Sequence, residues 1–327
     1  MKKIVGIIAA VAMIATSVFA ADITAKVRLD GSLFDYNGTV SALKINHNAG
    51  EAHNPLLAWS YGDDKSGASG KIWTVNDGNT GLNDKGEITT DGMAVTSGKF
   101  QIWFSPVDNL KLIFGNQSFN LNQEQLQWWR SDSGFESEGY GVNFGSDGFS
   151  IDLFLGNGWG NNWLAGSAVA TTAVKFQYGA DFGTVAAILV ANNSFKDLKF
   201  GVGYNNNFDG LFMFVNVLGY VNAAGFDKVR AEIFAKGNVD SFGWAAWIPF
   251  VFNLGTSKAE IGANVKFTFN QFYLDINDGN FLADPFEMSI KPGMTGSVGK
   301  CGYEVAVNFA IKNGVAVSVP VNFTVEW

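Results

Sequence analysis

The last thirteen residues, 315–327, read Val-Ala-Val-Ser-Val-Pro-Val-Asn-Phe-Thr-Val-Glu-Trp and decide the fold. Every odd position is apolar, and Ser318, Asn322, Thr324 and Glu326 occupy even positions. Side chains alternate between the two faces of a β-strand, so this period of two predicts a strand with one apolar and one polar face. Pro320 has no N–H to donate to a neighbouring strand, so we expect a local bulge there.

The same alternation recurs along most of the chain. In segment 22–34, Ile23, Val27 and Leu29 share one face, and Lys26 and Arg28 lie on the other. The alternating runs extend over about nine to thirteen residues, and a tilted strand needs ~9–11 residues to cross the hydrocarbon layer. Strands of globular proteins are usually ~5–6 residues long. The pattern therefore predicts an all-β fold, a transmembrane antiparallel up-and-down β-barrel.

Short turns rich in Gly, Asn and Asp alternate with longer connections, as in barrels with tight periplasmic turns and longer external loops. Counting the alternating segments predicts about sixteen strands, within a range of roughly 14–18. Segment 35–94 is interpreted as a long loop, external or folded into the barrel. Val40 to Ile45 and Lys71 to Val75 could instead form one extra hairpin and raise the number to about eighteen.

The N-terminus has the features of a secretory signal peptide. Lys2 and Lys3 precede an apolar run, and small residues stand before a predicted cleavage between Ala20 and Ala21. This divides the chain into a signal peptide, 1–20, and a single barrel domain, 21–327. Cleavage removes two lysines and takes the formal charge from −8 to −10. An acidic chain without a cluster of basic residues is not expected to bind nucleic acid.

The composition excludes several other classes. Charged residues make up 16% and aromatic residues 14%, yet no segment after residue 20 approaches the ~20 apolar residues of a spanning helix. Only helices and closed barrels satisfy every backbone polar group in lipid, which again favours a barrel. The single cysteine, Cys301, cannot form an internal disulfide.

Catalytic and cofactor motifs are missing. His47 and His53 are the only histidines, and the chain contains neither a GxSxG nor an HExxH motif. The acidic segment 76–92 does not have the spacing of a calcium-binding loop. We therefore expect a protein that is not an enzyme, with no cofactor and no metal site.

The N-terminal segment that ends in Val18-Phe19-Ala20 and the alternating C-terminal strand together resemble those of bacterial outer-membrane porins of the general-porin type. The resemblance covers the whole mature chain. It implies a passive diffusion channel for small hydrophilic solutes or ions through a water-filled barrel, embedded in lipid of the bacterial cell outer membrane and assembled as a homotrimer. It also implies that the barrel-assembly machinery reads the last strand, here Val321, Phe323, Val325 and Trp327. A terminal Phe is commoner in that family than the Trp found here.

Charged residues on the polar faces are candidates for the pore lining. They are Lys26, Arg28, Lys111, Lys175, Lys199, Arg230, Glu232 and Lys266. Charges that line a pore select ions by sign, and this set is mostly basic. Both a weakly selective pore and an anion-preferring pore remain open. Aromatic residues beside the short turns, including Phe144, Phe149, Tyr178 and Phe182, are expected to form an interfacial girdle.

Loop 116–137 is the candidate constriction because large rings in an external loop favour folding inward or contact with a partner. The residues expected to narrow the pore are Glu124, Trp128, Trp129 and Arg130, and sugars could stack on these tryptophans or on Trp159 and Trp163. The alternative function is a structural or adhesive surface barrel with a plugged lumen. A membrane-embedded hydrolase and a soluble secreted sandwich are further alternatives.

Overall fold

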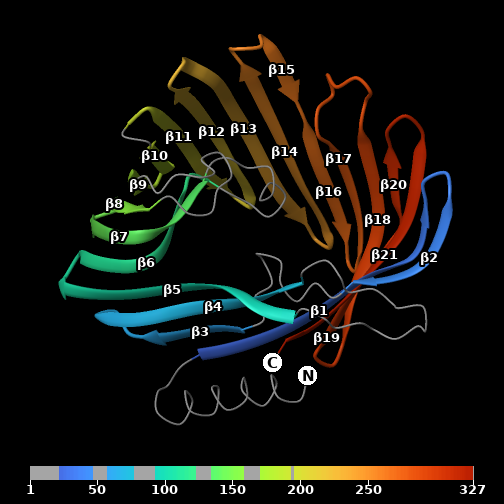
Figure 1. Cartoon of the computed structure of the whole chain (residues 1–327), viewed down its shortest axis with the longest axis horizontal. Coiled ribbons are helices and arrows are strands. Elements are labelled where there is room, and N and C mark those ends of the chain that lie inside the picture. The colour runs from blue at the N-terminus through green and yellow to red at the C-terminus, as the bar shows by residue number, and fades with distance from the viewer. Residues whose placement is uncertain are drawn as a thin grey trace.

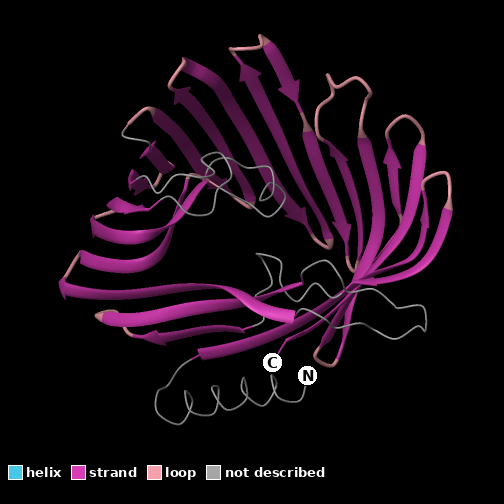
Figure 2. Ribbon diagram, in the orientation of Figure 1, coloured by secondary structure: helices cyan, strands magenta, loops and turns pink. Residues whose placement is uncertain are grey.

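The computed structural model describes residues 22–46, 57–76, 93–122, 134–157, 170–192 and 195–326. Across these residues the regular structure consists of β-strands, joined by turns and short loops (Figure 2). In these same ranges, no helix has the length and apolar character needed to cross a membrane.

The strands follow one another in chain order: β1 (Asp22–Tyr36), β2 (Val40–Asn46), β3 (Leu57–Gly62), β4 (Ser66–Asn76), β5 (Met93–Val107), β6 (Leu110–Asn120), β7 (Gly134–Ser146), β8 (Phe149–Asn157), β9 (Ala170–Ala180), β10 (Gly183–Asn192), β11 (Asp197–Phe208), β12 (Leu211–Asn222), β13 (Gly225–Val239), β14 (Phe242–Asn253), β15 (Lys258–Ile261), β16 (Ala263–Phe269), β17 (Phe272–Asp278), β18 (Met288–Val298), β19 (Cys301–Ala306), β20 (Asn308–Ile311) and β21 (Val315–Glu326).

The strands form one closed antiparallel sheet. Most strands pair with the strands that precede and follow them in the chain, and β1 pairs with β21, so the sheet curves round on itself (Figure 1). Closure by the β1–β21 pair gives the first and last strands a partner, as a sheet that spans lipid requires. The prediction of an up-and-down antiparallel barrel is confirmed.

The strand number differs from the central expectation. β2 and β3 both pair with β1, β15 and β16 both pair with β14, and β19 and β20 both pair with β21. In the described ranges the 21 segments therefore form 18 barrel strands. This number lies at the upper end of the predicted range of 14–18, because segment 35–94 is not merely a loop. It contributes β2, β3 and β4. The predicted hairpin partners, Val40 to Ile45 and Lys71 to Val75, lie in β2 and β4, but β2 pairs with β1, and β4 forms a hairpin with β3. The strands of this segment were hard to predict because Gly, Asn, Asp and Ser weaken the alternating pattern.

Prolines lie opposite two of the three strand interruptions. Pro249 of β14 lies opposite the break between β15 and β16, where Gly262 donates its N–H to the Pro249 carbonyl at 3.0 Å. Proline has no N–H to return this bond, so the ladder is incomplete at that step.

The second break is framed by two prolines. Val307, between β19 and β20, donates its N–H to the carbonyl of Pro292 at 2.9 Å. Pro320 of β21 faces the same break from the other side, and it pairs with Ser32 where β1 shifts register before Asp35. The bulge that the sequence predicts at Pro320 is confirmed.

The outer face of the barrel is apolar. Large exposed side chains occur at every second position of the strands, for example Phe200 and Val202 on β11 and Phe323 on β21. Rings cluster beside the short turns: Phe144 and Phe149 have centroids 5.7 Å apart, and Tyr178 and Phe182 are 6.1 Å apart. Exposed rings of this kind suit the boundary between lipid and water.

Candidate functional site

The inner face of the barrel is identified by the segment that follows β6. The Asn122 N–H donates to Asn216 Oδ1 of β12 at 3.3 Å, although the two residues are 94 positions apart. Directly paired residues of antiparallel strands point to the same face. Asn216 of β12 pairs with Glu232 of β13, so the Glu232 side chain also points inward. Phe234 lies two residues further along β13 and shares that face, and it pairs with Trp247 of β14, which therefore points inward as well.

One part of this inner wall is covered by apolar packing. A buried cluster joins the segment after β6 to the inner faces of β6, β8, β9, β10 and β12, and it consists of Phe119, Leu121, Phe154, Ala173, Ala186, Ile188, Val190, Leu218 and Tyr220. A smaller cluster contains Phe214, Phe234 and Trp247. A hydrophobic core inside the lumen, along the wall from β6 to β14, displaces water from that side.

Three of the pore-lining candidates lie on this covered wall. Lys199 and Glu232 are only 1% and 0% exposed, and Arg230 is buried as well. The Arg230 Nε donates to Glu232 Oε1 at 2.5 Å, and its guanidinium lies 5.9 Å from the centre of the Trp247 ring. The Lys199 ammonium lies 5.7 Å from the centre of the Tyr220 ring.

The wall formed by β16 to β21 carries a partly exposed polar cluster. Glu304 accepts hydrogen bonds from the Tyr273 hydroxyl, from Lys291 Nζ at 2.6 Å and from Asn322 Nδ2 at 3.0 Å. Lys266, another predicted pore-lining residue, holds its ammonium 5.0 Å from the centre of the Tyr273 ring. Charge and hydrogen bonding from five strands, β16, β17, β18, β19 and β21, therefore meet on one side of the lumen.

A second polar row crosses β5 to β9. The Lys111 ammonium lies 4.7 Å from the centre of the Trp103 ring, and Lys111 pairs with Asn143 on β7. The row continues through Asp152, which accepts a hydrogen bond from Asn143 at 2.6 Å, to Lys175 on β9. The predicted residues Lys111 and Lys175 thus lie on the inner face, half-buried, with an acid between them.

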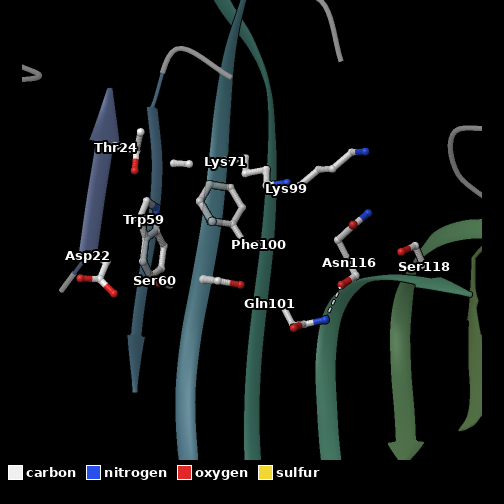
Figure 3. A pocket seen from close by; sticks show the side chains of 13 residues that line it. Asp22, Thr24, Trp59, Ser60, Lys71, Lys99, Phe100, Gln101, Asn116 and Ser118 are labelled. Carbon is white, nitrogen blue, oxygen red and sulfur yellow. Dashed lines mark hydrogen bonds between the residues drawn. The ribbon is translucent and has the colours of Figure 1, made fainter. Parts of the chain in front are cut away.

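A cavity of about 420 Å³ lies against β1, β3, β4, β5 and β6 (Figure 3). Lys71 and Lys99, which line it, are direct partners across β4 and β5. Gln101 lies beside them and donates its side-chain N–H to the Asn116 carbonyl at 2.8 Å. Like charges directly opposite each other repel, so this pair raises the local positive potential. Asp22 lines the same cavity.

Several predicted residues are placed only in part or not at all. Lys26 and Arg28 belong to β1, where their backbones pair with Glu326 and Thr324 of β21. Val321, Phe323 and Val325 belong to β21. The constriction residues Glu124, Trp128, Trp129 and Arg130, the ring candidates Trp159 and Trp163, the cleavage residues Ala20 and Ala21, and Trp327 lie outside the described residues.

The contact between Asn122, Asn205 and Asn216 and the cluster around Glu304 were not predicted from the sequence. One signal was available for the first of these. Asparagine is depleted in strands, so Asn205 and Asn216 inside otherwise regular strands marked positions with a polar partner. Which partner they meet depends on the path of the chain across the lumen.

No protein-family model matches the chain, and no curated protein matches it. Solved structures do match over nearly the whole length. A BenF-like porin from Pseudomonas fluorescens Pf-5 has a TM-score of 0.57 and 8% identity, covering 94% of this chain and 98% of that one.

The chain has the fold of bacterial outer-membrane porins. Two Pseudomonas aeruginosa structures agree. OccK2 (OpdF), solved in complex with glucuronate, has a TM-score of 0.57 and 8% identity, with 94% of this chain and 96% of that chain covered. OccK8 (OprE) has a TM-score of 0.55 and 9% identity, with 94% and 97% covered. At these identities the likeness concerns the porin fold alone.

Proposed function

We propose that this chain is a porin of the bacterial outer membrane, through which small hydrophilic solutes and ions diffuse passively. The observation that carries the proposal is the combination of a closed barrel, an apolar outer face and a partly exposed polar inner wall. A lipid-facing exterior places the barrel in a bilayer, and charged inner residues suit a wet lumen.

The test is conductance of the refolded mature chain, residues 21–327, in a planar lipid bilayer. Uniform single-channel steps at the nanosiemens scale are expected. Silence from a chain that still migrates as a folded, heat-modifiable barrel would overturn the proposal. That outcome would favour the plugged surface barrel, to which the apolar packing along β6 to β14 would then belong.

We further propose that the channel prefers anions. Lys71 and Lys99 form a basic pair at the cavity, and Lys111, Lys175 and Lys266 add positive charge to the inner wall. Pore-lining charge selects by sign. The glucuronate bound in OccK2 is one example of an anionic solute in a barrel of this fold. A reversal potential under a salt gradient whose sign shows anion preference supports this proposal. A sign that shows cation preference contradicts it.

The remaining expectations belong to the same proposal. The barrel assembles as a homotrimer, is folded into the membrane by the barrel-assembly machinery, and catalyses no reaction. The mass of the detergent-solubilised protein, measured by light scattering with the detergent contribution subtracted, distinguishes three copies from one.

A further inference from the structure

A cavity of about 460 Å³ lies near the end of the barrel that carries the β11–β12 and β13–β14 turns. Its lining includes Lys236 of β13, Lys266 of β16 and Gly210 of the β11–β12 turn. Small-molecule sites usually have volumes of roughly 300–1,000 Å³. Porins direct their short turns to the periplasm, so a solute that crosses the barrel meets this cavity at the periplasmic mouth.

The cavity belongs to the inner face of the wall. Lys236 lies two residues beyond Phe234 on β13, and Ala245 lies two residues before Trp247 on β14, so both side chains point inward with those rings. Lys266 of β16 pairs with Ala245 and therefore shares this face. The two lysines thus stand on either side of Ala245 in one cross-strand row.

Two small residues of β14 leave space between their neighbours. Ala245 separates the two lysines, and a longer side chain there would extend into the cavity. One row nearer the turns, Gly243 lies between Asn238 and Thr268. A Cβ at Gly243 would lie 2.5 Å from Thr268 Oγ1 and 2.7 Å from Asn238 Oδ1, so these two polar side chains lean over the glycine.

Aromatic rings position the two ammonium groups. Lys236 Nζ lies 5.1 Å from the centre of the Phe212 ring, and Lys266 Nζ lies 5.0 Å from the centre of the Tyr273 ring. The face of an aromatic ring attracts a cation through its quadrupole and carries no net charge. The rings therefore hold the ammonium groups in place and do not cancel their charge.

The described lining of this cavity contains no carboxylate. Two other cavities of the barrel each include one, Asp22 in the first and Glu260 in the second. Asp275 pairs with Lys266 across β16 and β17, but it does not line the cavity, and it pairs with Lys291 on its other side. The positive charge of the cavity is thus not offset by an acid within it.

We propose that this cavity is a binding subsite for a phosphorylated solute, such as a sugar phosphate, that passes through the barrel. The inference rests on the proposed channel function and names a solute class for it. A phosphate monoester carries about −1.5 to −2 charges at pH 7 and three acceptor oxygens, which match two ammonium groups. The Asn238 amide and the Thr268 hydroxyl add donors, and the rest of the cavity has room for the organic part.

Three solutes that share a sugar ring and differ in charge test the assignment. Glucose 6-phosphate, glucuronate and glucose carry about two, about one and no negative charges at pH 7. Isothermal titration calorimetry with the refolded mature barrel in detergent, in a phosphate-free buffer, should show saturable binding that is tightest for glucose 6-phosphate and absent for glucose. Glucuronate that binds as tightly as glucose 6-phosphate would overturn the assignment of a phosphate site.

Substitution of either lysine tests the charge. Lys236→Gln and Lys266→Gln should each weaken the binding of glucose 6-phosphate by about tenfold, because each removes one charge-assisted hydrogen bond. Lys300→Gln is the control for overall charge, because Lys300 is exposed in the β18–β19 turn. Equal weakening in all three variants would refute a local site.

Substitution of the small residue tests the shape. Ala245→Leu fills the space between the lysines at unchanged charge and should weaken binding at least tenfold. Ala310→Leu is the matched control, since the pairings from Trp247 through Ser289 place Ala310 of β20 on the inner face, away from the cavity. A folded Ala245→Leu barrel that binds like the wild type would overturn the proposal. The lysine variants keep the test decisive if Ala245→Leu does not fold.

Binding in detergent does not depend on conductance, so the two proposals can fail separately. A barrel that conducts ions in a planar bilayer but does not bind glucose 6-phosphate would refute the subsite and leave the channel function intact. A barrel that binds glucose 6-phosphate, loses it in the lysine variants and passes no current would refute the channel function and leave the subsite.

Discussion

Arg230 and Glu232 form a buried ion pair on the inner face of β13, with Nε 2.5 Å from Oε1. Their side chains are 10% and 0% exposed. Residues two apart on a strand share a face, which is how neighbours in sequence come to pair here. Removing two charges from water is costly, and their mutual attraction offsets that cost only while both partners are present.

Removing one partner of this pair should therefore lower the free energy of unfolding more than replacing both partners by apolar residues. We expect Glu232→Gln to lower the free energy of unfolding by about 3 kcal/mol, because it leaves a buried guanidinium without its carboxylate. Arg230→Met should have a similar effect. The double variant Arg230→Met/Glu232→Leu should lose less than the sum of the two, because neither member of the pair is left buried without the other. Urea unfolding of the refolded barrel, followed by Trp fluorescence, measures all three, and strict additivity would contradict the idea.

The turn regions contain a second, exposed ion pair, and its contribution to stability depends on pH. Lys65 Nζ lies 2.5 Å from Asp108 Oδ1, which joins the β3–β4 turn to the β5–β6 turn. The hydrogen bond from Lys65 lowers the pKa of Asp108, and the bond to Asp108 raises the pKa of Lys65. Backbone N–H groups of Ser66 and Lys65 lower the pKa of Asp63 in the same turn.

A carboxyl with a lowered folded-state pKa stabilises the fold above its unfolded pKa, and the contribution is lost as pH falls through the folded value. We therefore expect Asp108→Asn to unfold slightly more easily than wild type at neutral pH. The two proteins should converge as the pH falls below ~4, where the carboxyl takes up its proton. Thermal unfolding at a series of pH values checks this. A difference that persists at low pH would show that another interaction is responsible.

The cavity lysines give a prediction about ion selectivity. Lys71→Gln and Lys99→Gln each remove one positive charge from the inner wall, so the reversal potential should move toward cations, and further in the double variant. Lys300→Gln is the control, because Lys300 is exposed in the β18–β19 turn. Equal shifts in all three single variants would mean that overall charge, and not the cavity, sets the preference.

The last strand gives a prediction about assembly. Phe323 lies on the outer face of β21 and is 46% exposed, so its removal leaves the lumen unchanged. If the terminal strand is the assembly signal, Phe323→Ala should reduce the amount of barrel in bacterial outer membranes several-fold. The same variant should still refold in detergent micelles. Equal losses in cells and in detergent would instead indicate a general defect in folding.

The period of two was sufficient to predict a barrel and to place most strands within a few residues. It also placed Lys111, Lys175 and Lys266 on the polar face, where the structure has them. The pattern failed at 35–94, where glycine and asparagine dilute the alternation and β2, β3 and β4 were not all recognised. Lys199 and Glu232 illustrate a different limit: their face was predictable, but their burial was not.

The sequence by itself determined what depends on the local chain: strand alternation, the apolar outer face, the bulge at Pro320 and the polarity of the inner face. These follow from side chains that alternate every residue and from a proline that cannot donate a hydrogen bond. Tertiary structure alone decided which inner wall is covered, and that Asn122 meets Asn216 across 94 residues. A contact between distant residues depends on how the sheet closes and where a connection turns inward, and no local pattern carries that information.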